Sequence, residues 1–291
     1  MVNYYKYLSI SAKDEAWGLT VLNAGCTRIL PQSAYPFQSH PVHHNFNWAK
    51  GRVLQEYQLI YITRGRGLFE SESRGTQEVG PGTILTIFPD ERHRYKPAPE
   101  TGWDEYWVGF KGNVADHLRD KGFLKPDQPS VPVGYHEPLI NLFLEIIEET
   151  KEEAAGYQPL ISGAVTHLLG HLQAAVQRRS FEGRGVEAVV KRAKVLFRTH
   201  IDQPITPQQV ARELGVGYSK FRREFKAYTG LAPGQFQIQL KIQRAKELLV
   251  QSAKSVKEIA YALHFESSFY FSKLFKEKTG FSPAEYRKKV S

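Results

Sequence analysis

The chain of 291 residues is long for one domain and suits two, and 41% of its residues are hydrophobic, enough to form buried cores. No stretch reaches the roughly 18–20 uninterrupted apolar residues that a membrane-spanning helix needs, and the first residues lack the pattern of a secretory signal. A single cysteine, Cys26, allows no internal disulfide and excludes zinc-finger and iron–sulfur proteins. These features predict a cytoplasmic protein without membrane contact.

Charge is distributed unevenly along the chain. Residues 184–291 hold 21 Lys and Arg against 9 Asp and Glu, a net charge of +12, whereas residues 1–183 have a net charge of −3. A basic C-terminal part joined to a slightly acidic N-terminal part favours an anionic polymer, such as nucleic acid, bound at one end only. A charged, solvated helical surface would give the same composition, so charge alone leaves both interpretations open.

The first 130 residues have the composition and the apolar pattern of a β domain. Glycine, proline and aromatic residues are frequent there, and apolar alternation predicts strands at 59–63, 83–88 and 107–110. Turn signals such as Gly80-Pro81-Gly82 separate these strands. Several short strands joined by such turns predict a sandwich or a barrel.

From Glu137 onward the apolar spacing becomes helical and predicts helices over 137–149 and 160–176. The second helix carries a seam of apolar residues that alternate four and three apart: Ile161, Val165, Leu168 and Leu172. A strip of this length predicts a two-fold dimer through these helices. The alternative is that the outer face of the barrel covers the whole strip. The polar, glycine-containing segment that follows, residues 180–186, predicts an exposed linker.

An internal repeat is the strongest feature of the C-terminal part. Phe221-x3-Phe225-Lys226-x2-Thr229-Gly230 recurs 50 residues later as Phe271-x3-Phe275-Lys276-x2-Thr279-Gly280. Agreement at so many positions indicates a duplication.

Each copy of the repeat predicts two short helices joined by a tight turn, over 206–228 and 255–278. Thr206, Ser255 and Ser267 are good N-cap residues for helices in these units. A basic second helix in each copy is typical of a DNA-binding helix-turn-helix. In the first copy Phe221 and Phe225 must face the core, which leaves Ser219, Lys220, Arg222, Arg223 and Lys226 outside. In the second copy the same phase leaves Phe269, Ser272, Lys273 and Lys276 outside.

Over about residues 186–286 the sequence resembles the AraC/XylS family of bacterial regulators. The family signature is approximated by Ile259-Ala260-Tyr261-Ala262-Leu263-His264-Phe265 through Phe275-Lys276, followed by Gly280-Phe281-Ser282-Pro283. His264 departs from the family's usual glycine and predicts a strained left-handed turn. The resemblance implies two helix-turn-helix units, joined by a long helix at about 234–250, that enter successive major grooves of DNA. By position it implies base contacts at Ser219, Arg222 and Arg223 and at Ser268, Phe269, Tyr270, Ser272 and Lys273.

The N-terminal half is also similar to this family, whose effector domain is of the cupin type. The similarity lies in Tyr57–Gly67, Gly80–Tyr95 and Trp103–Phe110. In sugar-sensing members the ligand lies inside the barrel, and the resemblance implies effector contacts at Arg52, His93, Tyr95, Trp103, Glu105 and Trp107. Strand alternation puts Trp103, Glu105 and Trp107 on one face, where a buried carboxylate needs a polar partner such as a ligand. The alternative is that these aromatic residues simply fill the barrel.

The segment His40-Pro41-Val42-His43-His44 raises a metal hypothesis, because cupin enzymes bind metal through clustered His and Glu. The usual His-x-His with a downstream Glu is missing, and His93 alone resembles the second cupin motif. We therefore predict no metal and no cofactor.

Together these features predict an α+β protein: a cupin or jelly-roll β-barrel, a helical dimerisation segment, and an all-α double helix-turn-helix domain. The predicted boundaries are 1–135, 136–179, a linker at 180–186, and 187–291. The predicted function is a ligand-responsive, sequence-specific transcription regulator, an activator that senses a sugar. Its expected partners are an operator in duplex DNA, the effector and a second copy of the chain, with RNA polymerase as a further candidate. The protein is predicted to be cytoplasmic and associated with the nucleoid. The alternatives are a cupin enzyme and a ligand-independent regulator whose barrel only dimerises.

Overall fold

The computed structural model describes residues 3–33, 35 and 48–290 of the chain. The chain forms two compact units, Met1–Arg179 and Ser180–Ser291, which we call the N-terminal and C-terminal units. The N-terminal unit is rich in β-sheet and the C-terminal unit is helical, as the sequence predicts. Within the described ranges, no helix is both long and apolar enough to cross a membrane.

The N-terminal unit contains two antiparallel sheets, of six strands in the order β1-β2-β8-β3-β6-β9 and of three strands in the order β5-β4-β7. The strands are β1 Tyr4–Tyr7, β2 Thr20–Ile29, β3 Tyr57–Gly65, β4 Gly67–Ser71, β5 Gly75–Val79, β6 Thr83–Ile87, β7 His93–Pro97, β8 Trp103–Lys111 and β9 Ser130–Pro132. The three strands predicted from the sequence are β3, β6 and β8. An isolated bridge between Arg52 and His93 lies at the start of β7.

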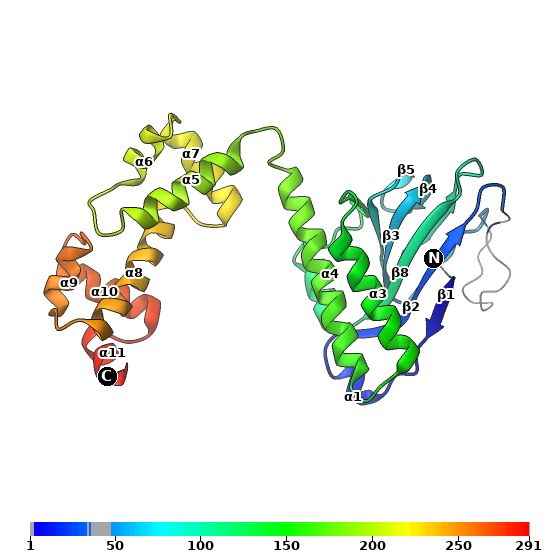
Figure 1. The fold of residues 1–291 in the computed structure, drawn as a ribbon, viewed down its shortest axis with the longest axis horizontal. Helices are drawn as coiled ribbons and strands as arrows, with labels where there is room; N and C mark the ends of the chain where they lie inside the picture. The colour runs from blue at the N-terminus through cyan, green and yellow to red at the C-terminus, as the bar shows by residue number, and fades with distance from the viewer. Residues whose placement is uncertain (1–2, 34, 36–47, 291) are drawn as a thin grey trace. The chain divides into compact units, whose positions relative to one another are not determined.

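Four helices complete the described part of the N-terminal unit: α1 Ala12–Glu15, α2 Asn113–Asp120, α3 Glu137–Glu152 and α4 Tyr157–Arg179. Figure 1 shows α3 and α4 side by side along the six-stranded sheet. Their apolar faces and one face of the sheet form a core that includes Val21, Val108, Phe110, Phe143 and Leu168. This core explains why two amphipathic helices follow the strands in the sequence.

The seam predicted for dimerisation lies inside this core. Ile161, Val165, Leu168 and Leu172 are each at most 2% exposed and pack within the chain, so they cannot meet a second subunit. The prediction of an interface through these residues is therefore wrong, because the strip is buried in the core that α3, α4 and the six-stranded sheet form. The outward face of the two helices instead carries isolated apolar residues, Leu144 at 40% and Leu160 at 48% exposed.

A second core lies on the other face of the six-stranded sheet and joins it to the three-stranded one. It contains Ile60 and Ile62 of β3, Phe69 of β4, Tyr95 of β7 and Trp103 of β8. Strand β8 supplies both cores, because successive side chains point to opposite faces of a sheet. Val108 and Phe110 face the helices, whereas Trp103 and Trp107 face the three-stranded sheet.

The C-terminal unit consists of seven helices over its described residues. They are α5 Val186–Thr199, α6 Pro207–Glu213, α7 Tyr218–Thr229, α8 Pro233–Gln251, α9 Val256–Ala262, α10 Ser268–Thr279 and α11 Pro283–Val290. Helices α6 and α7 form the first helix-turn-helix, and α9 and α10 form the second. Each has its own core, and α8 contributes Phe236 and Leu240 to the first core and Ile242 and Leu249 to the second. At about 1.5 Å per residue, this 19-residue helix is about 28 Å long.

The predicted helix ends are confirmed. Thr206 and Ser255 form capping boxes, and the Ser267 hydroxyl accepts a hydrogen bond from the Tyr270 N–H. Gly230 and Gly280 end the second helix of each unit in the left-handed conformation.

His264 is left-handed, with φ 52°, as its place in the family pattern predicts; Gly215, with φ 68°, closes the corresponding turn of the first unit. The imidazole Nε2 of His264 lies 3.1 Å from the carbonyl oxygen of Asp202, so the Nε2–H tautomer donates a hydrogen bond to the segment before α6. This contact connects the two helix-turn-helix units and offsets part of the cost of the strained turn.

Candidate DNA-binding and effector-binding sites

The second helix of the first helix-turn-helix, α7, separates apolar and cationic side chains. Phe221 and Phe225 are at most 1% exposed and hold the helix against α5 and α6. The predicted DNA-contacting residues of this helix are all exposed: Ser219, Lys220, Arg222, Arg223 and Lys226. None of these cations forms an ion pair with another described residue, so their charge remains available to a phosphate backbone.

The second unit repeats this separation on α10. Phe271 and Phe275 are fully buried, whereas Lys273 and Lys276 are exposed. Ser268 and Ser272 are half-buried, and Tyr270 is 39% exposed. Phe269 has the most exposed large apolar side chain in the described chain, at 79%. Both helices therefore present exposed cations supported by buried phenylalanines, and α10 also exposes the Phe269 ring.

The predicted effector residues come together in the N-terminal unit, between its two sheets. Glu105 is 6% exposed, and among the described residues its Oε2 has no hydrogen-bond partner. Burial raises the pKa of Glu105 to about 8, against the attraction of Arg52. At neutral pH this side chain is therefore mostly a carboxylic acid, which can donate one hydrogen bond and accept others.

Comparison with the neighbouring acid, Asp104, shows which interactions Glu105 lacks. Asp104 is 5% exposed, yet Arg28 and Arg64 both form salt bridges with it, at 3.0 Å and 3.1 Å. Two guanidinium groups thus neutralise one buried acid of β8, whereas an oxygen of the next acid has no hydrogen-bond partner within the described part of the chain. An unpaired buried oxygen costs about 1–3 kcal/mol, which a hydroxyl-bearing ligand would recover.

A hydrogen-bonded group of three side chains lies beside Glu105. The Arg52 guanidinium donates to the Tyr95 hydroxyl at 2.8 Å and to the His93 Nε2 at 3.2 Å. Burial and Arg52 lower the pKa of His93 to about 3, so its ring is neutral. The Nδ1–H then donates to the Glu91 carbonyl at 3.1 Å, which fixes the tautomer.

Two tryptophans give this cluster flat apolar surfaces. Trp103 is fully buried and lies 6.0 Å from the Tyr95 ring. Trp107 is half-buried against the same core, opposite Gly25 of β2. A Cβ at Gly25 would lie 2.3 Å from the Trp107 ring, so only glycine leaves room for the ring in this position. The structure therefore brings together all six effector residues predicted from the sequence.

Sequence reasoning missed two tyrosines of this cluster. The Tyr35 ring is 6.5 Å from that of Tyr95, and the pKa of Tyr35 is raised mainly by burial. The pKa of Tyr7 is raised to about 12, also mainly by burial, while Arg52 opposes the rise. Both lie outside the three segments that resemble the family, and pairing of β1 with β2 brings Tyr7 into the unit.

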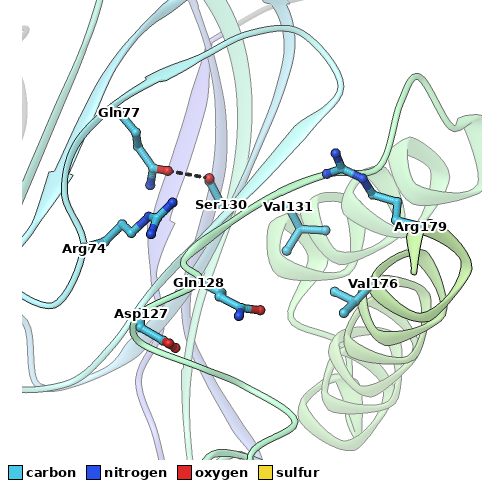
Figure 2. Close-up of a pocket in the computed structure, with 8 residues that line it drawn as sticks. All are labelled: Arg74, Gln77, Asp127, Gln128, Ser130, Val131, Val176 and Arg179. Atoms are coloured by element: carbon cyan, nitrogen blue, oxygen red, sulfur yellow. Dashed lines mark hydrogen bonds between the residues drawn. The ribbon is translucent and has the colours of Figure 1, made fainter. Parts of the chain in front are cut away.

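The described residues also line cavities that were not predicted. One, of about 180 Å³, adjoins the effector cluster through Tyr35 and is bounded by Trp48 and Lys96. Another, of about 380 Å³, lies between the β4–β5 hairpin, the segment before β9 and the end of α4 (Figure 2). There the Gln77 side chain accepts a hydrogen bond from the Ser130 hydroxyl, with Arg74 and Arg179 on opposite walls.

The metal hypothesis falls on His40, His43 and His44, which lie outside the described residues. Among the residues that are described, no group of three or more His, Cys, Asp or Glu side chains could hold a metal ion.

Two family models match the chain. A model described as an AraC-like ligand binding domain matches residues 37–169, and a helix-turn-helix domain model matches residues 210–289. The first match includes the strands and helices around Glu105, and the second includes both recognition helices.

Whole-chain relatives agree with both matches. The chain is 28% identical to the MmsAB operon regulatory protein of Pseudomonas aeruginosa, over 81% of this chain and 76% of that protein. It is 22% identical to the Msm operon regulatory protein of Streptococcus mutans, over 82% and 86%. It is 25% identical to the arabinose operon regulatory protein of Escherichia coli, over 80% and 81%. These relatives are regulators and not enzymes, so the chain belongs to the AraC family of DNA-binding transcription regulators, with an N-terminal ligand-binding domain and a C-terminal helix-turn-helix domain.

Proposed function

We propose that this regulator binds a specific operator through α7 and α10 and that a small polyhydroxylated effector, a sugar, controls it from the N-terminal unit. The observation that carries the proposal is the buried oxygen of Glu105, which lies among aromatic rings and has no hydrogen-bond partner among the residues that the structure describes, in a chain whose other unit presents two cationic recognition helices. The proposed domains are 1–135 for effector binding, 136–179 as the helical segment that carries the dimer contact, 180–186 as a linker, and 187–291 for DNA binding.

The proposed DNA site divides into two kinds of contact. Arg222 and Arg223 suit guanine, because a guanidinium can donate two hydrogen bonds to the guanine O6 and N7 in the major groove. Lys220, Lys226 and Lys276 suit phosphates, because an ammonium group is a compact charge without a preferred plane.

Replacing Arg223 with alanine is expected to weaken binding to the specific operator by about 1–3 kcal/mol and to relax the base preference at one position. Lys276→Ala is the matched comparison: it should weaken binding to operator and random DNA alike and reduce the salt slope by about one unit. Fluorescence anisotropy over a salt series measures both effects. If Arg223→Ala weakened binding to the operator and to random DNA equally, Arg223 would have no role in base recognition.

The chemistry of the effector cluster supports a sugar. Trp107 offers a ring face for an apolar sugar surface, while protonated Glu105, the Tyr95 hydroxyl and the Arg52 guanidinium can exchange hydrogen bonds with hydroxyl groups. A cluster with few polar groups among aromatic walls is typical of small-molecule sites. The relative named for the arabinose operon makes sugars the first class to screen.

Trp107→Ala is expected to reduce effector affinity by at least tenfold, since it removes a large stacking surface at the site. The effector is first found as the mono- or disaccharide that raises the melting temperature of the full chain. Calorimetric titration of that sugar then compares Trp107→Ala with Trp17→Ala, a control tryptophan that is 61% exposed. Unchanged affinity in Trp107→Ala would place the effector elsewhere; no thermal shift with any sugar would favour a ligand-independent regulator.

Activation, dimerisation and contact with RNA polymerase belong to the same proposal. Two copies of the chain would present two DNA-binding domains, and paired half-sites raise avidity without new contacts. Because the seam of α4 is buried, we place the dimer contact on the outward face of α3 and α4, around Leu144 and Leu160. Light scattering at tens of micromolar tests this; a monomer with and without sugar and operator would refute the dimer.

A further inference from the structure

The two recognition helices share a buried face and differ on the exposed one. At a spacing of 50 residues, Phe271 and Phe275 repeat Phe221 and Phe225. On the exposed face Ser219 is replaced by Phe269, Arg222 by Ser272, and Arg223 by Lys273. The same scaffold therefore carries two different chemical surfaces, the first with two guanidinium groups and the second with an aromatic ring.

Within the described chain, the Phe269 side chain does not contribute to the packing of the fold. It is 79% exposed, whereas its neighbour Tyr270 packs 6.5 Å from the Phe265 ring. Among the described residues, Phe269 belongs to neither core of the C-terminal unit. It is the second residue of α10, and the first residues of a recognition helix are the ones that reach base edges in the major groove.

The major groove offers one apolar group to such a side chain. Guanine, cytosine and adenine present hydrogen-bond donors and acceptors there, whereas thymine also presents its C5-methyl group. A phenyl ring has no donor or acceptor, so its contact with a base edge favours the base that carries the methyl group.

We infer that Phe269 selects thymine in the half-site read by the second helix-turn-helix, through contact with the C5-methyl group. The inference rests on the proposed function, because it assumes that α10 lies in the major groove. It adds that the operator is chemically asymmetric: the arginine-bearing first unit selects a different base from the phenylalanine-bearing second unit.

The size of the effect follows from burial of one methyl group. Removing that methyl group is expected to weaken binding about fourfold, which corresponds to about 0.8 kcal/mol. The effect should be confined to one or two positions of the operator, because a single ring covers little more than one base step.

The experiment begins by selecting an operator for the full-length protein from random duplex DNA. Each thymine of the selected site is then replaced singly by deoxyuridine, which removes only the methyl group, and affinity is measured for the parent and for Phe269→Ala. A thymine–adenine pair is also replaced by cytosine–guanine with or without a 5-methyl group on the cytosine. Tyr261→Ala is the matched control, since Tyr261 is an exposed aromatic residue of the preceding helix, α9.

We expect one deoxyuridine substitution to weaken the parent and Tyr261→Ala about fourfold and to leave Phe269→Ala unchanged. At the same position, DNA with 5-methylcytosine should bind the parent and Tyr261→Ala better than DNA with cytosine, whereas Phe269→Ala should not distinguish the two. If the operator binds specifically but no thymine shows this dependence on Phe269, the inference is wrong and the proposed DNA function stands. If no sequence is enriched, the proposed function fails, and the inference fails with it. Because Phe269 is exposed, an unchanged melting temperature should show that the variant is folded.

Discussion

Replacing Leu168 with glutamate should unfold the N-terminal unit while leaving the C-terminal unit intact. The Leu168 side chain of α4 is fully buried in the core that α3, α4 and the six-stranded sheet form. Loss of a buried leucine costs about 2–5 kcal/mol, and a carboxylate placed there without a partner adds several more. The sum is about the whole stability of a typical domain, about 5–15 kcal/mol.

The sequence provides a selective probe for this experiment, because all four tryptophans, Trp17, Trp48, Trp103 and Trp107, lie in the N-terminal unit. Tryptophan fluorescence therefore follows unfolding of this unit alone, and far-ultraviolet circular dichroism should retain the helical signal of the other. Thr166→Glu, at an exposed position of the same helix, should change the fluorescence transition little. A folded, monomeric Leu168→Glu protein would instead support the buried seam as a subunit interface.

The second large effect is a loss of stability with rising pH that depends on Glu105. Its pKa rises from 4.5 to about 8 on folding, so the stability associated with the protonated form is complete below pH 4.5 and is lost as pH rises to 8. The pKa of His93 falls from 6.5 to about 3, so its contribution is complete above pH 6.5 and is lost on acidification. The two slopes cancel between pH 4.5 and 6.5, and Glu105 alone acts between pH 6.5 and 8.

The ligand-free protein should therefore lose about 2 kcal/mol of stability in the N-terminal unit between pH 6.5 and 8, at about 1.36 kcal/mol per pH unit. Glu105→Gln keeps the neutral shape and removes the titration, so its stability should stay nearly constant over this range and exceed that of the parent at pH 8. Urea unfolding followed by tryptophan fluorescence measures the difference. Glu100→Gln, an exposed glutamate, serves as the control. Parallel pH profiles for the parent and Glu105→Gln would show that Glu105 is ionised and compensated.

The amino-acid pattern was sufficient to predict the local structure of the C-terminal unit. The caps at Thr206, Ser255 and Ser267 and the buried phenylalanines are set by interactions within a few residues, and all are as predicted. The helices α5 and α11, which frame the two helix-turn-helix units, were not identified. The hydrogen bond from His264 to the Asp202 carbonyl joins residues 62 apart and leaves no sequence signal.

In the N-terminal unit, alternation along β8 correctly placed Trp103, Glu105 and Trp107 on one face. It could not show that Arg28 and Arg64 would neutralise Asp104 and leave Glu105 without such a partner, because these arginines come from β2 and β3. The seam of α4 was misassigned for a related reason. An apolar stripe indicates only that one face of a helix is buried. Whether that face packs against a sheet or against a second subunit depends on tertiary structure.

The separate cores on either side of α8 also bear on how the DNA-binding unit opens. Phe221 and Phe225 share no core with Phe271 and Phe275, so one half can lose its packing while the other retains it. Amide hydrogen exchange should then divide the unit into two cooperative groups with different opening free energies, joined by α8. Each half can also accumulate substitutions on its own exposed face without destabilising the other. A duplicated scaffold of this kind can therefore change the sequence it recognises one half-site at a time.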